Sequence, residues 1–213
     1  MKDIPMFTTS SGVASLILQE IPYRAEAYVR IRSCSDLGGL LDECVSFCKA
    51  VGAERIYATG HEGLQAYPLH TAILRMACPA ESLPDTDAAV FPVTGQTLAS
   101  WQSLYNRRMA EVDNAAWLTD AGARQMLQKG DGYFVHRQGS LLGIGRASGG
   151  TLDAVVSASP GCGAEVVLAL CHAITEDTVT LEVASTNGRA IRLYEKLGFV
   201  ITGEVSRWYG IGL

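Results

Sequence analysis

The 213-residue sequence is 48% hydrophobic and 18% charged, which is enough apolar material for a sizeable core and excludes an intrinsically disordered chain. Its formal net charge is −5 and its longest basic run is Arg107-Arg108, so we expect no nucleic-acid partner. No apolar stretch is long enough to cross a bilayer or to form a signal peptide, so we expect a cytoplasmic protein with no membrane partner.

The six cysteines are expected to be buried free thiols in a reducing compartment. None belongs to a C-x-x-C pair, and the four histidines have no ligand spacing relative to them, so we expect no metal site. A zinc site is the alternative. Cys44 and Cys48 are four residues apart on one face of a predicted helix, where they would pack as small apolar residues.

The first part of the chain, residues 1–80, predicts an α/β segment. Alternating and β-branched stretches predict strands, and apolar residues at helical spacing after Asp36 predict a helix that ends before Gly52. The predicted elements are strands at 13–19 and 25–32, a helix at 36–50, and strands at 55–58 and 70–77.

Turn-forming residues at 79–87 predict a linker to a second part, residues 86–213. Strands and helices mix in this part, which indicates an α/β (α+β) fold class. The predicted elements are a strand at 89–93, helices at 94–110 and 119–128, strands at 133–136, 141–146 and 152–157, a helix at 165–173, a strand at 178–184, a further helix, and a strand at 201–209.

The further helix, which follows the strand at 178–184, carries a recognisable spacing. Ser185, Thr186 and Asn187 offer side-chain oxygens that can cap its start, and an apolar face includes Ala190 and Tyr194. Gly198 suits a left-handed C-terminal cap, and Phe199 begins the next strand. Asn187, Ala190, Tyr194, Gly198 and Phe199 fit the pattern N-x-x-A-x-x-x-Y-x-x-x-G-F.

That pattern resembles the signature of the GNAT acetyltransferases (GCN5-related N-acetyltransferases). The resemblance implies a GNAT-like mixed, mostly antiparallel central sheet flanked by helices, formed by residues 86–213. The order of elements in residues 1–80 echoes the second half of such a domain. We therefore expect an N-terminal α/β extension that is a degenerate half GNAT domain; an unrelated α+β extension is the alternative.

In GNAT proteins coenzyme A lies between two separating strands, with its pyrophosphate on a [Q/R]-x-x-G-x-[G/A] turn before a helix. Free N–H groups and the helix dipole favour an anion there. Here the turn has Ala158 at the first position, keeps both glycines and contains no arginine. The resemblance implies acetyl-CoA as cosubstrate, bound by Val155, Val156, Ser157, Gly161, Cys162, Gly163, Ala164, Asn187, Ala190 and Tyr194.

The resemblance also implies catalytic roles. Tyr194 would protonate the departing thiolate, and a main-chain N–H near Val155 or Val156 would polarise the thioester carbonyl. Glu182 would be the general base, because the local sequence is similar to the branch that acetylates ribosomal-protein N-termini. The alternatives are a core role for Tyr194 and a solvated or arginine-paired Glu182.

The helix predicted at 94–110 corresponds to the one that usually borders the acceptor pocket in GNAT proteins. Trp101, Tyr105 and Arg108 on this helix are therefore candidates for the pocket, with core packing or surface exposure as the alternative.

The function that this resemblance implies is transfer of an acetyl group from acetyl-CoA to a primary amine, which is either a peptide N-terminus or a small amine. The alternatives are a coenzyme A-binding module that has lost catalysis and a protein-interaction module. A homodimer is left open.

Overall fold

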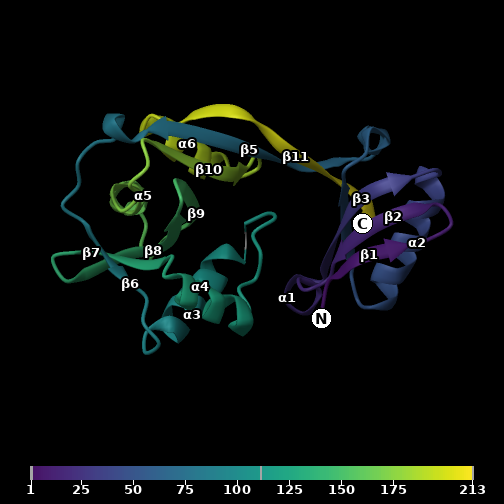
Figure 1. Cartoon of the computed structure of the whole chain (residues 1–213), viewed down its shortest axis with the longest axis horizontal. Coiled ribbons are helices and arrows are strands. Elements are labelled where there is room, and N and C mark those ends of the chain that lie inside the picture. The colour runs from purple at the N-terminus through teal and green to yellow at the C-terminus, as the bar shows by residue number, and fades with distance from the viewer. Residues whose placement is uncertain (1, 111, 213) are drawn as a thin grey trace. The chain divides into compact units, whose positions relative to one another are not determined.

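The computed structural model describes residues 2–110 and 112–212. The chain forms two compact units, one made of residues 2–73 and 204–212 and the other of residues 74–203 (Figure 1). Strands β5 (Leu69–Pro79) and β11 (Val200–Gly212) each contribute to both units. The domain boundaries expected from the sequence, 1–80 and 86–213, stay a prediction.

The first unit contains a sheet with the strand order β1-β2-β3-β4-β11. Its strands pair antiparallel except for β3 and β4, which pair in parallel and are connected along the chain by helix α2. Its elements are β1 (Ile4–Thr8), β2 (Gly12–Ile17), α1 (Ile21–Arg24), β3 (Glu26–Cys34), α2 (Leu37–Ala50), β4 (Arg55–Thr59) and the 3₁₀ turn η1 (Glu62–Ala66), with parts of β5 and β11.

The second unit contains a sheet with the strand order β5-β10-β9-β8-β7-β6. Strands β6 to β9 pair antiparallel, whereas β9 and β10 pair in parallel. Besides β5 and β11 it has η2 (Ala80–Ser82), β6 (Ala89–Pro92), α3 (Leu98–Met109), α4 (Asp120–Lys129), β7 (Gly132–Arg137), β8 (Ser140–Ser148), β9 (Thr151–Ser157), α5 (Gly163–His172), β10 (Thr178–Ala184) and α6 (Gly188–Lys196). This mixed, mostly antiparallel sheet with flanking helices confirms the predicted fold class.

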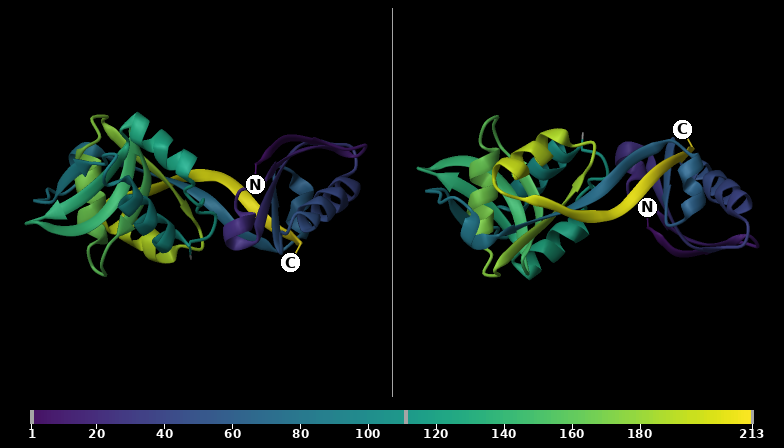
Figure 2. Two further views of the ribbon diagram at one scale, coloured as in Figure 1. Left: turned by 90° about the horizontal axis from the view of Figure 1, so that it is seen from below. Right: turned by 90° about the horizontal axis from the view of Figure 1, so that it is seen from above.

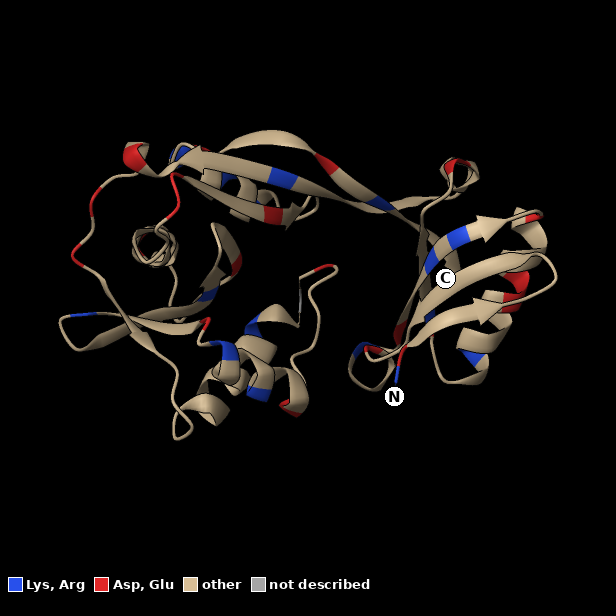
Figure 3. Ribbon diagram, in the orientation of Figure 1, with Lys and Arg blue, Asp and Glu red and all other residues tan. Residues whose placement is uncertain are grey.

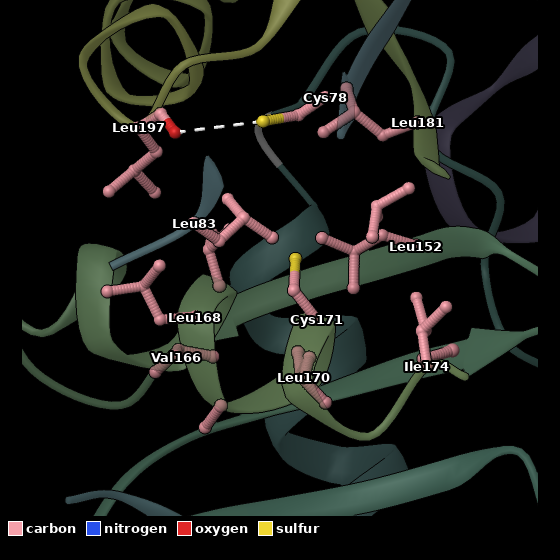
Figure 4. Close-up of a cluster of buried hydrophobic side chains, with 14 of the residues drawn as sticks. Cys78, Leu83, Leu152, Val166, Leu168, Leu170, Cys171, Ile174, Leu181 and Leu197 are labelled. Carbon is pink, nitrogen blue, oxygen red and sulfur yellow. Dashed lines mark hydrogen bonds between the residues drawn. The ribbon is translucent and has the colours of Figure 1, made fainter. Parts of the chain in front are cut away.

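Helices cover both faces of the second unit's sheet. Figures 1 and 2 show α5 on one side of β7 and β8, and α3 and α4 on the other. The α5 side holds the larger core, which Figure 4 shows with Cys78 and Cys171 among aliphatic side chains. The opposite side holds a smaller core around Trp101 and Val156.

Two expectations about element boundaries are corrected. Strand β1 was not predicted, because Pro5 interrupts its pattern; proline is tolerated here because β1 is an edge strand. Helix α3 begins at Leu98 and not at Thr94, because Thr94 and Thr97 hydrogen-bond to each other in a turn before the helix.

All six cysteines are free thiols, as predicted, and Cys44 and Cys48 are buried on one face of α2. The expectation that all six are buried is wrong for Cys34 and Cys162, which are partly exposed because they lie at the end of β3 and at the start of α5. No helix among the described residues is long and apolar enough to cross a membrane.

Helix α5 lies close against β8 because glycines occupy the facing positions of that strand. A Cβ atom added to Gly145 would overlap the side chain of Leu170 and the carbonyl oxygen of Ala154. Residues Val166 to Cys171 of α5 are consecutively buried, so the helix has little freedom to move away.

We therefore predict that Gly145→Ala lowers the free energy of unfolding by about 1–3 kcal/mol, as overpacking of a core does. Urea denaturation measures this change. Gly95→Ala is the control, because a Cβ at Gly95 meets no atom within 4 Å; it should change stability by less than about 0.5 kcal/mol. Equal stability of the two variants would show that α5 does not rest on β8 as described.

Candidate functional site

Strands β9 and β10 separate soon after they begin to pair. Their parallel ladder consists of Thr180 opposite Thr151 and Leu181 opposite Leu152. Strand β9 continues to Ser157 and β10 to Ala184, and no further ladder pair joins them among the described residues. In the first unit, by contrast, the parallel strands β3 and β4 pair through five consecutive positions, 26–30 with 55–59. Of the two parallel strand pairs, only β9 and β10 separate from each other while both strands continue.

The open edge of β9 carries main-chain groups that need a partner. Ala158 N–H donates to the Leu142 carbonyl on β8, and Val156 lies opposite Ile144. Since successive residues of a strand turn their N–H groups to opposite edges, Val155 and Ser157 direct theirs toward the β10 side. The Val156 side chain packs in the smaller core. Of the two predicted oxyanion donors, this geometry favours Val155.

The turn predicted to hold a pyrophosphate follows directly. Gly161 adopts φ of +90°, is exposed, and a Cβ there would meet nothing within 4 Å. Cys162 is the N-cap of α5 and makes no side-chain cap hydrogen bond, so the first amides of α5, from Gly163 and Ala164, are not used by a cap. Helix α5 is ten residues long, from Gly163 to His172, so aligned peptide dipoles add up at this end.

Two arginines lie close to this turn. Arg137 of β7 forms an ion pair with Glu165 in the first turn of α5, which offsets the one acidic side chain there. Arg108 of α3 donates from Nη2 to the carbonyl oxygen of Ala158, at the first position of the turn. The sequence offered Arg108 only as a candidate for the acceptor pocket; the structure places it at the turn, 50 residues away along the chain.

Helix α6 closes the other side of the opening. The Asn187 Oδ1 atom accepts a hydrogen bond from Ala190 N–H at 3.2 Å, so of the three candidate capping residues Asn187 is the N-cap. A Cβ on Gly163 would lie 3.0 Å from Leu193 Cδ2, so α6 approaches the start of α5 closely. No residue of α6 is fully buried, and its apolar side chains, including Ala190 and Tyr194, stay partly exposed.

Tyr194 combines a packed ring with an unused hydroxyl. Its ring centroid lies 5.8 Å from that of Phe199 and packs against the larger core. No hydrogen bond to its hydroxyl occurs among the residues that the structure describes. Burial, with a smaller contribution from Cys171, raises the pKa of Tyr194 to about 12. The phenol is therefore protonated at neutral pH and can act as a proton donor.

Glu182 lines a cavity of about 460 Å³ at the point where β9 and β10 separate. Its carboxylate lies 2.9 Å from Arg75 Nη2 of β5, so the arginine-paired alternative is the one observed. Leu181 and Val183 face the larger core, which leaves Glu182 on the opposite face. The lining residues are Arg75, Thr151, Leu152, Asp153, Thr180, Leu181 and Glu182.

Asp153 contributes a second carboxylate to this cavity, and no sequence motif pointed to this residue. Leu152 and Ala154 lie opposite the consecutive residues Ala147 and Arg146 of β8, so Asp153 is the extra residue of a β-bulge. Continuing the β9–β10 register places it beside Glu182. Burial raises the pKa of Asp153, while the nearby Arg146 acts in the opposite direction.

The remaining candidates on α3 have different roles. Trp101 is fully buried and stacks on Tyr105, with ring centroids 5.4 Å apart. Both belong to the smaller core, so the core alternative describes them. Among the described residues, no three His, Cys, Asp or Glu side chains come together as a metal site would require.

Comparison with known proteins identifies the same part of the chain. The family model described as "FR47-like protein" matches residues 156–209, which include the turn, α5, β10 and α6. No curated protein matches the sequence.

Solved structures share the fold over nearly the whole chain. A functionally unknown conserved protein from Staphylococcus epidermidis is 12% identical, with a TM-score of 0.59, over 97% of this chain and 93% of that one. A GCN5-related N-acetyltransferase from Sphaerobacter thermophilus is 15% identical, with a TM-score of 0.55 over 94% and 77%. A GNAT-family acetyltransferase from Colwellia psychrerythraea is 12% identical, with a TM-score of 0.53 over 96% and 84%.

The raised pKa of Tyr194 predicts a loss of stability in alkali. An unfolded tyrosine ionises near pH 10.0, whereas folded Tyr194 holds its proton to about 12. Between these values the folded state binds more protons, so the free energy of unfolding falls as pH rises. Tyr194→Phe should lose less stability over this range than the wild type. Urea denaturation at about pH 9 and about pH 11, which bracket the ordinary tyrosine pKa, measures the difference. Identical pH dependence in both proteins would contradict the burial described.

Proposed function

We propose that this chain, which has the fold of the GNAT superfamily and an FR47-like segment at 156–209, transfers an acetyl group from acetyl-CoA to a primary amine. The predicted GNAT resemblance is confirmed at the level of fold and segment. The narrower resemblance to the branch that acetylates ribosomal-protein N-termini stays a prediction, as do the cytoplasmic location and the question of a homodimer.

The observation that carries the proposal is the opening between β9 and β10, which leads to an uncapped helix start. The pantetheine arm would lie along Val155, Val156 and Ser157, whose open edge can hydrogen-bond its amides. The pyrophosphate would lie on the amides from Gly161 to Ala164, including Cys162 and Gly163, where the α5 dipole favours negative charge. Asn187, Ala190 and Tyr194 of α6 would line the other side.

The proposed chemistry needs three contributions from the chain. The amine nitrogen attacks the thioester carbonyl carbon, and negative charge develops on the carbonyl oxygen, where the Val155 N–H would stabilise it. The C–S bond then breaks, and the departing thiolate takes a proton from the Tyr194 hydroxyl. A carboxylate accepts the proton that the amine nitrogen loses.

We propose Glu182 as that carboxylate. It lines the cavity at the point of strand separation, and Arg75 fixes its position. Asp153 is the rival, because it lines the same cavity and its raised pKa makes it a stronger base than an ordinary aspartate. Two carboxylates in a polar cavity of about 460 Å³ suit a positively charged acceptor, such as a small amine or the end of a peptide.

The N-terminal unit does not support a second cosubstrate site. Its β3-α2-β4 crossover has the same order as β9-α5-β10, which supports the proposal that it is a degenerate half GNAT domain. Its parallel strands pair along the whole of β4, five positions, so among the described residues β3 and β4 do not separate into two facing unpaired strands as β9 and β10 do. We therefore propose one acetyl-CoA per chain.

Calorimetric titration with acetyl-CoA tests this function. We expect saturable binding with a stoichiometry of one, followed by release of free thiol when a panel of small amines and peptides is added. Tyr194→Phe should bind acetyl-CoA as the wild type does but turn over about 10²- to 10⁴-fold more slowly, as loss of a general acid predicts. Binding without thiol release from any amine would favour the coenzyme A-binding module, and no binding would favour the protein-interaction module.

Paired substitutions distinguish the two carboxylates. We expect Glu182→Gln to lower kcat/KM by about 10²- to 10⁴-fold, as loss of a general base predicts. Asp153→Asn should lower kcat/KM by less than about tenfold. Steady-state measurements of kcat/KM on one amine substrate at a single pH compare the two variants. If Asp153→Asn cost more than Glu182→Gln, the roles would be reversed.

A further inference from the structure

The predicted pyrophosphate turn has no cationic side chain of its own. Its first position is Ala158, and residues 158–164 contain neither arginine nor lysine. The guanidinium of Arg108 nevertheless lies at this turn, since its Nη2 atom donates to the Ala158 carbonyl oxygen. Figure 3 shows basic positions on α3 and α4, the helices on this side of the sheet.

Helical periodicity explains why Arg108 reaches the turn. Trp101, Leu104 and Tyr105 form the stripe of α3 that packs on the sheet, and Arg108 follows at the next helical step of three to four residues. Ala158 packs against the same core. Arg107, one residue earlier, lies about 100° further around the helix and points away from this stripe.

Hydrogen bonds fix α3 both in its first turn and near the end that carries Arg108. Trp101 Nε1 donates to the Tyr133 carbonyl oxygen at 2.9 Å. Asn106 bonds twice to Leu118: its Nδ2 donates to the carbonyl oxygen at 3.0 Å, and its Oδ1 accepts from the N–H at 2.8 Å. A guanidinium on a helix held in this way has less freedom to lose when it binds a ligand.

The charge of Arg108 is not used by an acid that the structure describes. None of the described carboxylates forms an ion pair with Arg108. Glu165, the acidic residue in the first turn of α5, is paired with Arg137. Arg108 is exposed, and a guanidinium has five N–H donors, of which one is used on Ala158.

We propose that Arg108 supplies, from α3, the cation that the turn lacks, and that it binds the pyrophosphate of coenzyme A seated on the amides of residues 161–164. This inference rests on the proposed function. The fork of a guanidinium can donate two parallel hydrogen bonds to phosphate oxygens, which a lysine cannot do. Recognition of the nucleotide end of the cosubstrate would then depend on two segments, the turn and α3.

The test compares two thioesters that share the acetyl-pantetheine arm, of which only one has the nucleotide end with its pyrophosphate. Calorimetry would measure the binding of acetyl-CoA and of acetyl-pantetheine, which has the same thioester arm without the nucleotide. We expect Arg108→Met to weaken acetyl-CoA about tenfold, the size of one charge-assisted hydrogen bond, and to leave acetyl-pantetheine unchanged. Arg108→Lys should recover part of the loss, because it keeps the charge but not the fork.

Arg107→Met is the matched control, because it removes an equal charge from the same last turn of α3. It should bind both thioesters like the wild type. Added KCl should weaken acetyl-CoA binding less in Arg108→Met than in the wild type, because one ionic contact is missing. Thermal melting would verify that every variant is folded.

Three results would overturn the inference. The first is wild-type affinity for acetyl-CoA in Arg108→Met. The second is an equal loss in Arg107→Met, which would indicate a general field effect. The third is an equal loss for both thioesters, which would show that Arg108 only supports the Ala158 turn. If the wild type itself did not bind acetyl-CoA, the proposed function would fail first, so the two failures are distinguishable.

Discussion

The second unit depends on one constraint, which is that the β9–β10 ladder stops after two residue pairs. Beyond Leu152 and Leu181, the facing edges of the two strands carry main-chain groups that must find partners elsewhere. The antiparallel ladder to β8 fixes the far edge of β9, and helix α5, pressed onto the glycines of β8, fixes the strand that follows. The opening is therefore held by its surroundings and does not close by a small shift.

The same strand-helix-strand order appears twice in the chain with opposite results. In the first unit β3 and β4 stay paired over five positions, and their main-chain groups satisfy one another. In the second unit the unpaired edge, the exposed Gly161 turn and the partly exposed apolar face of α6 come together. A thioester with an amide-bearing arm and an anionic end has the chemistry that these three features can bind.

Local features of the site could be predicted from the sequence, and features that depend on packing could not. The Asn187 cap and the glycine turn are set by residues within one turn of each other, so their spacing was sufficient. The position of Asp153 depends on a bulge, which a sequence pattern does not reveal. Arg108 was noted as a candidate, but its place at Ala158 follows only from how α3 packs on the sheet.

Hydrogen–deuterium exchange with and without acetyl-CoA tests whether the β9–β10 opening holds the cosubstrate. If it does, acetyl-CoA should slow the exchange of the amides at 154–164 and at the start of α6. The amides of β3 and β4 should be unaffected, because their ladder is already complete. Unchanged exchange at 154–164, or protection confined to β3 and β4, would show that the opening does not hold acetyl-CoA.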